Sequence, residues 1–474
     1  MRRTFSRFSP RYTRSLVYML QASEYHVHDF LAWHRRVSDF RQVEKRKSIQ
    51  WTAKARFFFA LGWAVSVCFI AASITVLLWV PLQYGIILAL ALMLANAYAL
   101  PYALAGVASL VYRVQMLYER YVLRNIAKKL RAHRALKIGV AGSFGKTSMR
   151  EILKTVLAEG KKVAAPEGSF NTPLGIQSFV DTLDGDEEIL IFELGEYYPG
   201  DVKKLCEAIA PDIGFITGVN EAHLEKFGSL TSTTATIFEL ADYMQGKPVY
   251  VNAENERARH GAREGHILYS REGVDGWRVE DAATTLEGTS CTLVSGSIRI
   301  PVHSKLLGLH VVGPLGAAGH LAYTLGFSVA AIESGLAKTR PFPHRLEPRT
   351  DRSGVTTLDD SYNGNPDGVA AIIEFLKNLK HRRTYVTPGL VEAGESVERV
   401  HRAIGKQLAG AGIERVVLIR NSVTPFIAAG LKDAKYTGEV IWYDDALKAY
   451  AALPLMTVQG DIVVLQNDWP DQYA

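Results

Sequence analysis

The most pronounced hydrophobic pattern in the chain runs from Phe57 to Tyr112 and contains no charged side chain and no histidine. About 20 consecutive apolar residues are enough to cross a bilayer as a helix. The segment Pro81-Leu82-Gln83-Tyr84-Gly85 divides the run into two parts of this length. We predict a transmembrane hairpin over residues 57–112, with helices at 57–80 and 86–110. The alternative is a hairpin buried in a large soluble core. The run begins too far from the N-terminus to resemble a signal peptide.

Basic residues crowd both sides of this run, with 13 Lys and Arg against 4 Asp and Glu in residues 1–56, and 8 against 1 in 113–137. Because positive flanks stay cytoplasmic, both ends are expected in the cytoplasm of a multi-pass protein of the cell (inner) membrane. The net charge of +6 therefore combines +16 in the first 137 residues with −10 in the other 337. This division favours a segment close to the lipid bilayer, or a purely topogenic signal, over a nucleic-acid binder.

Two shorter segments flank the hairpin. Residues 1–56 form a basic cytoplasmic segment, and residues 113–136 are expected to form a basic linker helix. Within the first segment, apolar side chains spaced through residues 15–34 predict a helix lying near the membrane interface, or one packed against the soluble part.

From Lys137 onward, apolar runs of strand length alternate with helical patterns, which is typical of an α/β fold with a mostly parallel sheet. Short alternating segments between about 266 and 305 predict a small antiparallel addition. A second alternation begins near Val355, after a hinge marked by two prolines at 341–345. We expect a central domain over 137–340 and a C-terminal domain over 341–474. The predicted strands are 138–142, 189–194, 213–217 and 248–252, then 355–359, 384–388, 415–419, 439–442 and 461–466.

A glycine-rich loop follows the first of these strands and precedes a helical pattern. It reads Gly142-Ser143-Phe144-Gly145-Lys146-Thr147, with Ser148 opening the helix. Glycines let backbone N–H groups approach phosphate oxygens, a helix N-terminus favours negative charge, and the lysine neutralises phosphates. The hydroxyl of Thr147 can ligate magnesium. The alternative is an ordinary glycine turn, because Val140 stands where the longer form of this loop has a glycine.

Polar clusters follow several of the predicted strands, where open α/β sheets bind ligands. They are Glu193-Leu194-Gly195-Glu196, Asn220 to Glu225, and Asp359 to Pro366. Carboxylates and an imidazole near a phosphate loop are candidate magnesium ligands, whereas helix caps and solvated turns are the structural alternative. The three cysteines are far apart and predict neither a disulfide framework nor a zinc site.

Together these segments resemble the Mur ligases over about residues 137–474. The resemblance rests on Gly142 to Thr147, Gly168 to Gly175, Glu193 to Gly195, Ala222 to Leu230, Pro343 to Arg345 and Asp359 to Pro366. It implies a P-loop central domain, a Rossmann-like C-terminal domain, and ATP and Mg²⁺ as cofactors. The implied reaction joins a carboxylate-bearing cell-envelope precursor to an amino acid or dipeptide, through an acyl phosphate.

The resemblance also implies roles for individual residues. Lys146, His223 and Arg345 are catalytic. Thr147, Glu193 and His223 hold magnesium. Nucleotide contacts come from Gly142, Ser143, Gly145, Lys146, Thr147, Ser148, Arg345 and Asp360, and substrate contacts from Asn171, Thr172, Tyr362, Asn363 and Asn365.

The chain departs from the family at several positions. Ile237 stands where the family has a lysine that is modified to a carbamate, so Glu239, or Glu225 beside His223, is the candidate replacement. Val311 and Pro314 replace two asparagines of the family's adenine site, and Gln466-Asn467-Asp468 replaces a Lys-Gly-Ser segment. The membrane hairpin takes the place of the N-terminal domain that binds the UDP-sugar.

These observations predict a membrane-anchored, ATP-dependent amide ligase of cell-wall precursor synthesis. Two alternatives stay open. One is a ligase of the folylpolyglutamate or cyanophycin type, and the other is a degenerate nucleotide-binding scaffold at the membrane.

Overall fold

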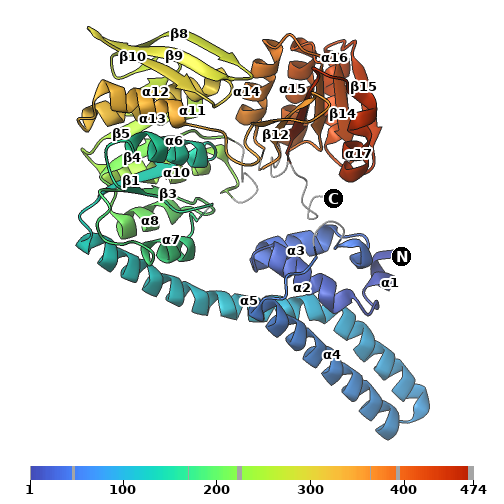
Figure 1. Cartoon of the computed structure of the whole chain (residues 1–474). Coiled ribbons are helices and arrows are strands. Elements are labelled where there is room, and N and C mark those ends of the chain that lie inside the picture. Colours follow the sequence, from blue (N-terminus) through green and yellow to red (C-terminus); the bar gives the residue numbers. More distant parts are fainter. Residues whose placement is uncertain are drawn as a thin grey trace. The chain divides into compact units, whose positions relative to one another are not determined.

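The computed structural model describes residues 2–44, 48–168, 170–220, 227–362, 364–390 and 396–467. The described chain divides into two compact units, the first ending at Arg120 and the second beginning at Tyr121 (Figure 1). Each unit has hydrophobic clusters of its own, so the two are described separately.

Two long helices, α4 (Ala53–Trp79) and α5 (Leu82–Ala132), form the hairpin of the first unit (Figure 1). Both are long and apolar enough to cross a membrane. Only 11% of the most apolar window of α4 and 22% of that of α5 is buried, which contradicts a hairpin hidden in a soluble core. A hairpin helix at 86–110 and a linker helix at 113–136 were predicted separately, but α5 runs unbroken from Leu82 to Ala132 because its charged continuation is rich in good helix formers.

The start of the hairpin is covered by α1 (Arg2–Ser6), α2 (Tyr12–Ala22), α3 (Val27–Arg36) and the short η1 (Phe40–Gln42). The single helix predicted over 15–34 was wrong, because Glu24 and Tyr25 take positive φ angles and break it. Leu16, Met19 and Phe30 are fully buried and pack with residues of α4 and α5. The apolar faces of α2 and α3 are therefore buried within the first unit.

A ten-stranded sheet organises the first part of the second unit, in the order β10-β9-β8-β7-β6-β5-β4-β1-β3-β2. The pairs from β2 to β6 are parallel and those from β6 to β10 antiparallel, as predicted. The strands are β1 (Leu136–Ala141), β2 (Val163–Ala164), β3 (Ile189–Glu193), β4 (Ile213–Ile216), β5 (Val249–Asn252), β6 (Ile267–Ser270), β7 (Gly273–Val274), β8 (Trp277–Thr285), β9 (Gly288–Ser295) and β10 (Ile298–Ser304).

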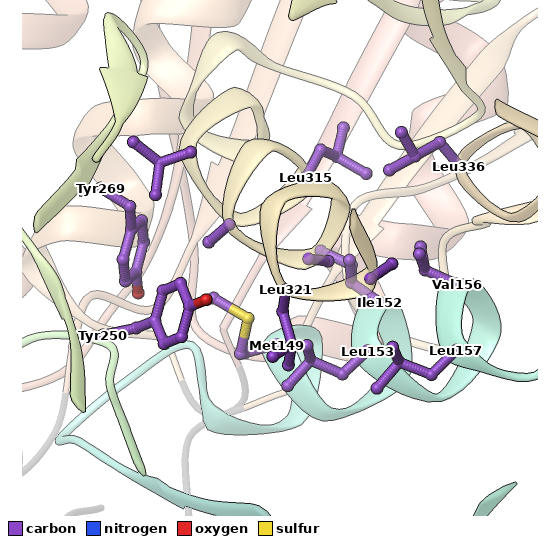
Figure 2. Packing of buried hydrophobic residues seen from close by; sticks show 14 of the residues in the cluster. Met149, Ile152, Leu153, Val156, Leu157, Tyr250, Tyr269, Leu315, Leu321 and Leu336 are labelled. Atoms are coloured by element: carbon purple, nitrogen blue, oxygen red, sulfur yellow. The ribbon is translucent and has the colours of Figure 1, made fainter. Parts of the chain in front are cut away.

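Helices cover both faces of the parallel part of this sheet (Figure 1). One face carries α6 (Lys146–Leu157), η2 (Leu309–Val311), α12 (Val312–Thr324) and α13 (Val329–Lys338). The other carries α7 (Pro173–Val180), α8 (Asp201–Ile209), α10 (Leu230–Met244), α11 (Glu256–Gly261) and the last turns of α5. Figure 2 shows Met149, Ile152 and Leu153 of α6 packed with Leu321 of α12. This buried face of α6 anchors the helix that follows the glycine-rich loop.

The C-terminal part is a second sheet with the order β11-β12-β16-β13-β14-β15, parallel except for the edge strand β11. The sequence pattern does not predict β11, which is short and contains Pro348. The strands are β11 (Glu347–Thr350), β12 (Thr356–Asp360), β13 (Arg383–Thr387), β14 (Arg415–Ile419), β15 (Glu439–Tyr443) and β16 (Ile462–Gln466), and the helices are α14 (Pro366–Lys377), α15 (Val397–Gly410), α16 (Thr424–Asp433) and α17 (Ala446–Met456).

The packing of α2 on α4 predicts a sharp difference between two glycines of the hairpin. A Cβ atom added at Gly62 would lie 2.6 Å from Thr13 Cγ2, whereas one at Gly106 would have no atom within 4 Å. Both substitutions to leucine gain similar helix propensity, so their difference reports the collision. Gly62→Leu should therefore be about 1–3 kcal/mol less stable than Gly106→Leu. Thermal denaturation of the full chain in detergent tests this, and equal melting temperatures would contradict the packing.

Candidate functional site

The glycine-rich loop joins the end of β1 to the start of α6, as predicted. Gly142 has φ +146° and Gly145 has φ +75°, conformations that favour glycine. A Cβ atom at Gly142 would overlap Thr217 Oγ1 and approach Gly218, which follow the neighbouring strand β4. The glycines and the adjoining strand end thus give this loop the backbone geometry that is typical of phosphate-binding loops.

Lys146 opens α6 and folds back over this loop. Its Nζ donates to Glu196 Oε1 at 2.7 Å and also to the carbonyl oxygen of Gly142. Glu196 is buried, so an acidic partner holds the ammonium group at the phosphate loop.

A buried carboxylate stands beside the next residue of α6. The Thr147 hydroxyl donates to Glu193 Oε2 at 3.3 Å, and Arg150 Nη1 lies 2.8 Å from Glu193 Oε1. Burial raises the pKa of Glu193, while the cations of Arg150 and Lys146 oppose the shift. Neighbouring oxygen ligands of an octahedral Mg²⁺ lie about 2.9 Å apart, so Thr147 and Glu193 suit one magnesium ion. Arg150 was missed because it looks like an ordinary helix residue in the sequence.

Other predicted site residues lie around β3 or outside the described residues. The carbonyl oxygen of Asn171 accepts a hydrogen bond from Gly195 N at 3.1 Å, which places Asn171 beside the loop after β3. Thr172 caps α7 by accepting from Gly175 N at 3.3 Å, a structural role. His223, Glu225 and Asn363 lie outside the described residues.

A cavity of about 360 Å³ lies between the two parts of the second unit. The phosphate loop contributes Gly145 and Ser148 to its wall, and the hinge contributes Arg345. Its other lining residues include Asp360, Asn365, Val311 and Pro314, with Asn252, Arg271, Leu306, Leu307, His310, Phe342, Leu346 and Glu374. The structure thus brings predicted nucleotide contacts from both domains to one cavity, with an apolar wall and a charged one.

Two buried charges mark the C-terminal side of this cavity. Burial raises the pKa of Asp360 to about 6, although the cation of Arg345 opposes the shift. Burial also lowers the pKa of Arg345, whose guanidinium carbon lies 5.0 Å from the centre of the Tyr362 ring. A carboxyl group, a guanidinium group and an aromatic ring therefore lie close together at the end of β12.

Asn220, at the end of the segment after β4, connects the phosphate loop to the C-terminal part. Its backbone N donates to Ser143 Oγ at 3.3 Å. Its Nδ2 donates to Asn365 Oδ1 at 2.9 Å and to Asp367 Oδ2 at 2.8 Å, both at the start of α14. A second link joins Arg271 Nη1 to Glu374 Oε1 at 2.9 Å. Sequence analysis placed Asn220 in a polar cluster but did not assign it this role.

Glu239 caps a helix, and this structural role argues against the prediction that it replaces the family's carbamate. Its two carboxylate oxygens accept from Gly200 N at 2.7 Å and Lys203 N at 2.9 Å, which caps the start of α8. Ile237 is fully buried in the core. The position of the family lysine is thus part of the apolar packing.

Asn467 ties together the strand ends of the C-terminal sheet. Its backbone N donates to Asp360 O at 3.0 Å, its Oδ1 accepts from Gly364 N at 2.9 Å, and its Nδ2 donates to Gly389 O at 2.6 Å. Beside it, Gln466 Oε1 accepts from the Thr387 hydroxyl at 2.8 Å. The residues that replace the family's Lys-Gly-Ser segment therefore organise these loops.

Comparison with known families agrees with this architecture. The Mur ligase middle domain matches residues 140–321, and the Mur ligase glutamate ligase domain matches residues 344–466. The chain therefore contains the middle and C-terminal domains of a Mur ligase and belongs to that family. The predicted two-domain α/β fold is confirmed.

Individual relatives place the resemblance within the family. The UDP-N-acetylmuramoyl-tripeptide–D-alanyl-D-alanine ligase of Mycobacterium tuberculosis (strain ATCC 25618 / H37Rv) is 30% identical over 306 residues, which are 62% of this chain and 60% of that protein. The chain thus matches less than two thirds of this relative's length.

Solved structures show the same fold. MurF from Acinetobacter baumannii superposes with a TM-score of 0.65 at 20% identity, over 74% of this chain and 77% of that one. MurF from Thermotoga maritima in complex with ADP gives 0.64 at 23% identity, over 74% and 80%.

The raised pKa of Asp360 predicts a pH dependence of stability. A carboxyl group whose pKa is higher in the folded chain contributes stability that is complete below its unfolded pKa, about 3.9. That contribution is lost as the pH rises through the folded pKa of about 6. Asp360→Asn keeps the shape without the charge. It should therefore stabilise the protein relative to wild type above pH 6, by roughly 3 kcal/mol at most, and much less near pH 4.

Thermal denaturation of both proteins across this pH range measures the effect. Asp351→Asn is an opposite-sign control, because hydrogen bonds led by the one from Ser353 lower the pKa of Asp351. If the difference in stability between wild type and Asp360→Asn does not change with pH, the raised pKa of Asp360 is contradicted.

Proposed function

We propose that this chain is a membrane-anchored, ATP-dependent ligase that forms an amide bond between a carboxylate-bearing cell-envelope precursor and an amino acid or dipeptide. The observation that carries the proposal is the phosphate loop with Lys146, next to Thr147 and Glu193, beside a cavity that Arg345 and Asp360 line from the second domain. The names of the relatives support peptidoglycan precursor synthesis as the setting.

In the proposed reaction, an oxygen of the substrate carboxylate bonds to the γ-phosphorus of ATP, and the bond to the β-γ bridging oxygen breaks as ADP leaves. The amine nitrogen then bonds to the acyl carbon, the carbon–oxygen bond to phosphate breaks, and the amine loses a proton. The first step brings two anions together, so fixed positive charge is the main requirement.

Residues of this chain meet that requirement at both sides of the cavity. The loop N–H groups and Lys146 would face the phosphates, and Arg345 would add a cation from the hinge. Thr147 and Glu193 would hold magnesium, which supplies further positive charge when bound. Asp360 is placed to accept hydrogen bonds from a ribose. The links from Asn220 to Asn365 and Asp367 hold the two domains together around the nucleotide.

A nucleotide-binding scaffold is the second candidate, and the burial of Ile237 together with the capping role of Glu239 favours it. Ile237 has no ligand atom, and both carboxylate oxygens of Glu239 are used to cap α8, so neither residue supports a second magnesium ion.

The ligase and the scaffold differ in turnover. Full-length protein should be incubated with ATP, magnesium and a panel of wall precursors and amino acceptors, including D-alanyl-D-alanine and glutamate. Mass spectrometry of a new amide, together with phosphate release, supports the ligase; tight ATP binding without turnover supports the scaffold.

Lys146→Ala should lower turnover by about 10²-fold or more, because it removes a strong electrostatic stabiliser of the transferred phosphate. The same change leaves Glu196 buried without its cation, so Lys146→Ala combined with Glu196→Gln separates catalysis from misfolding. Lys154→Ala, on the same helix α6 but outside the loop, is the matched control. Phosphate release under saturating ATP measures the effect. A folded Lys146 variant with the wild-type rate would exclude the loop from the mechanism.

The positive flanks predict that both ends of the hairpin face the cytoplasm. Single cysteines at Ser48, Gln83 and Gln115, introduced after Cys68→Ala, place one exposed thiol on each flank and one at the turn. A membrane-impermeant maleimide should label Gln83→Cys from outside intact cells. It should label Ser48→Cys and Gln115→Cys only in inverted vesicles. Labelling of the two flanks from opposite sides, or recovery of the chain in the soluble fraction, would refute the hairpin topology.

A further inference from the structure

Two arginines near the N-terminus lie against the flank of the hairpin. The guanidinium carbon of Arg7 lies 4.1 Å from the centre of the Tyr98 ring on α5 and 5.8 Å from that of Phe40. Arg3 Nη2 donates to His34 O at 2.9 Å. Both arginines influence the Tyr12 hydroxyl electrostatically, and that hydroxyl donates to Ala97 O at 3.2 Å. Arg3 and Arg7, here called the arginine pair, therefore gather beside residues 97–98 of α5.

The arginine pair has no acidic partner among the residues that the structure describes. Other arginines of the same unit do have one. Arg14 Nε lies 2.8 Å from Glu44 Oε2, and Arg41 Nη2 lies 2.7 Å from Asp39 Oδ2. The Nε of Arg3 is buried and lacks a hydrogen-bond partner within the described chain. Arg3 therefore adds positive charge from within the protein, and the edge of the Arg7 guanidinium is the group suited to an anion from outside.

The depth of the arginine pair along the hairpin indicates where that anion lies. Tyr98 is 16 positions beyond Leu82, where α5 begins, and a helix rises 1.5 Å per residue, which gives about 24 Å. The hydrocarbon core of a bilayer is about 30 Å thick. With the turn of the hairpin at the far interface, the arginine pair reaches the boundary of the near leaflet, where long arginine side chains meet lipid phosphates.

The surroundings of the arginine pair fit the same boundary. Phe5, Phe8 and Tyr102 are exposed, as is the Tyr98 ring under Arg7. Aromatic side chains concentrate at membrane interfaces, where they present an apolar body to the acyl chains. Basic groups flanked by such rings are the arrangement expected for recognition of an anionic head group.

We propose that the arginine pair binds the phosphate group of an anionic phospholipid in the cytoplasmic leaflet. Arg7 stacks on Tyr98 and directs its N–H edge at the phosphate oxygens, and Arg3 adds a second positive charge beside it. Hydrogen bonds between charged groups are roughly twice as strong as neutral ones. This inference rests on the proposed membrane anchoring, since the site requires the hairpin to be inserted.

The test uses full-length protein purified in detergent, titrated with phosphatidylglycerol, phosphatidylcholine or inorganic phosphate, and measured by native mass spectrometry and thermal denaturation. Phosphatidylglycerol should bind at a saturable site and raise the melting temperature, and the other two should not. Arg7→Gln should weaken this binding about tenfold, and Arg3→Gln combined with Arg7→Gln should abolish it. Arg41→Gln removes the same charge from an arginine already paired with Asp39 and should leave lipid binding unchanged.

Each contrary result has a definite meaning. Equal binding of phosphatidylcholine, or equal weakening by Arg7→Gln and Arg41→Gln, would overturn the site. A shift produced by inorganic phosphate alone would show an anion site that does not select lipid, which also overturns the proposal. Arg7→Lys keeps the charge but loses the planar guanidinium group. If this variant is folded and binds phosphatidylglycerol with intermediate affinity, the weaker binding of Arg7→Gln does not result from unfolding. Cysteine labelling reports membrane insertion separately, so failure of the anchoring and failure of the lipid site can be distinguished.

Discussion

The phosphate loop depends on how closely the ends of β1 and β4 approach each other. At Gly142 the backbone lies so near Thr217 and Gly218 that a Cβ atom would collide with them, and parallel pairing of the two strands fixes this approach. The Thr217 hydroxyl donates to the carbonyl oxygens of Ala141 and Phe144, which bends the loop back towards the sheet. The buried face of α6 then fixes the direction in which the helix leaves the loop. The course of this loop is therefore a consequence of strand packing, and its side chains extend from a backbone that the sheet and α6 fix.

Buried charges at this edge are arranged in opposed pairs. Lys146 is paired with Glu196 and Arg150 with Glu193, and Arg345 is close enough to Asp360 to oppose the rise in its pKa. A buried charge is costly without a partner. Each cation that a nucleotide would use is thus stabilised by a carboxylate when no phosphate is bound. Phosphate and magnesium binding would rearrange these pairs, so the site can be strongly charged and still fold.

The sequence was informative wherever function depends on local order. The charge-free run predicted two long apolar helices, and the glycine-rich motif predicted a strand, a loop and a helix in that order, because both patterns are continuous in the chain. It was less informative about partners far apart in sequence. Asn220 donates to Asn365, and Glu239 caps the helix that begins at Asp201. Neither contact produces a hydrophobic periodicity or a local motif that could be recognised in the sequence. Helix ends were also misjudged. The apolar helix and the linker helix over 113–136 were predicted as two helices, whereas α5 passes through the end of the apolar run without a break.

Departures from the family pattern fall into two physical groups. At Ile237 the family lysine is replaced by a side chain that packs in the core, so a charge there would have to be buried. At Val311 and Pro314 the replaced residues line the cavity, where a change alters what the wall recognises without disturbing the fold. The first change removes a candidate metal-supporting group, and the second alters the wall of the cavity. The phosphate loop, Glu193, Arg345 and Asp360 belong to neither group, which is why the ligase interpretation rests on them.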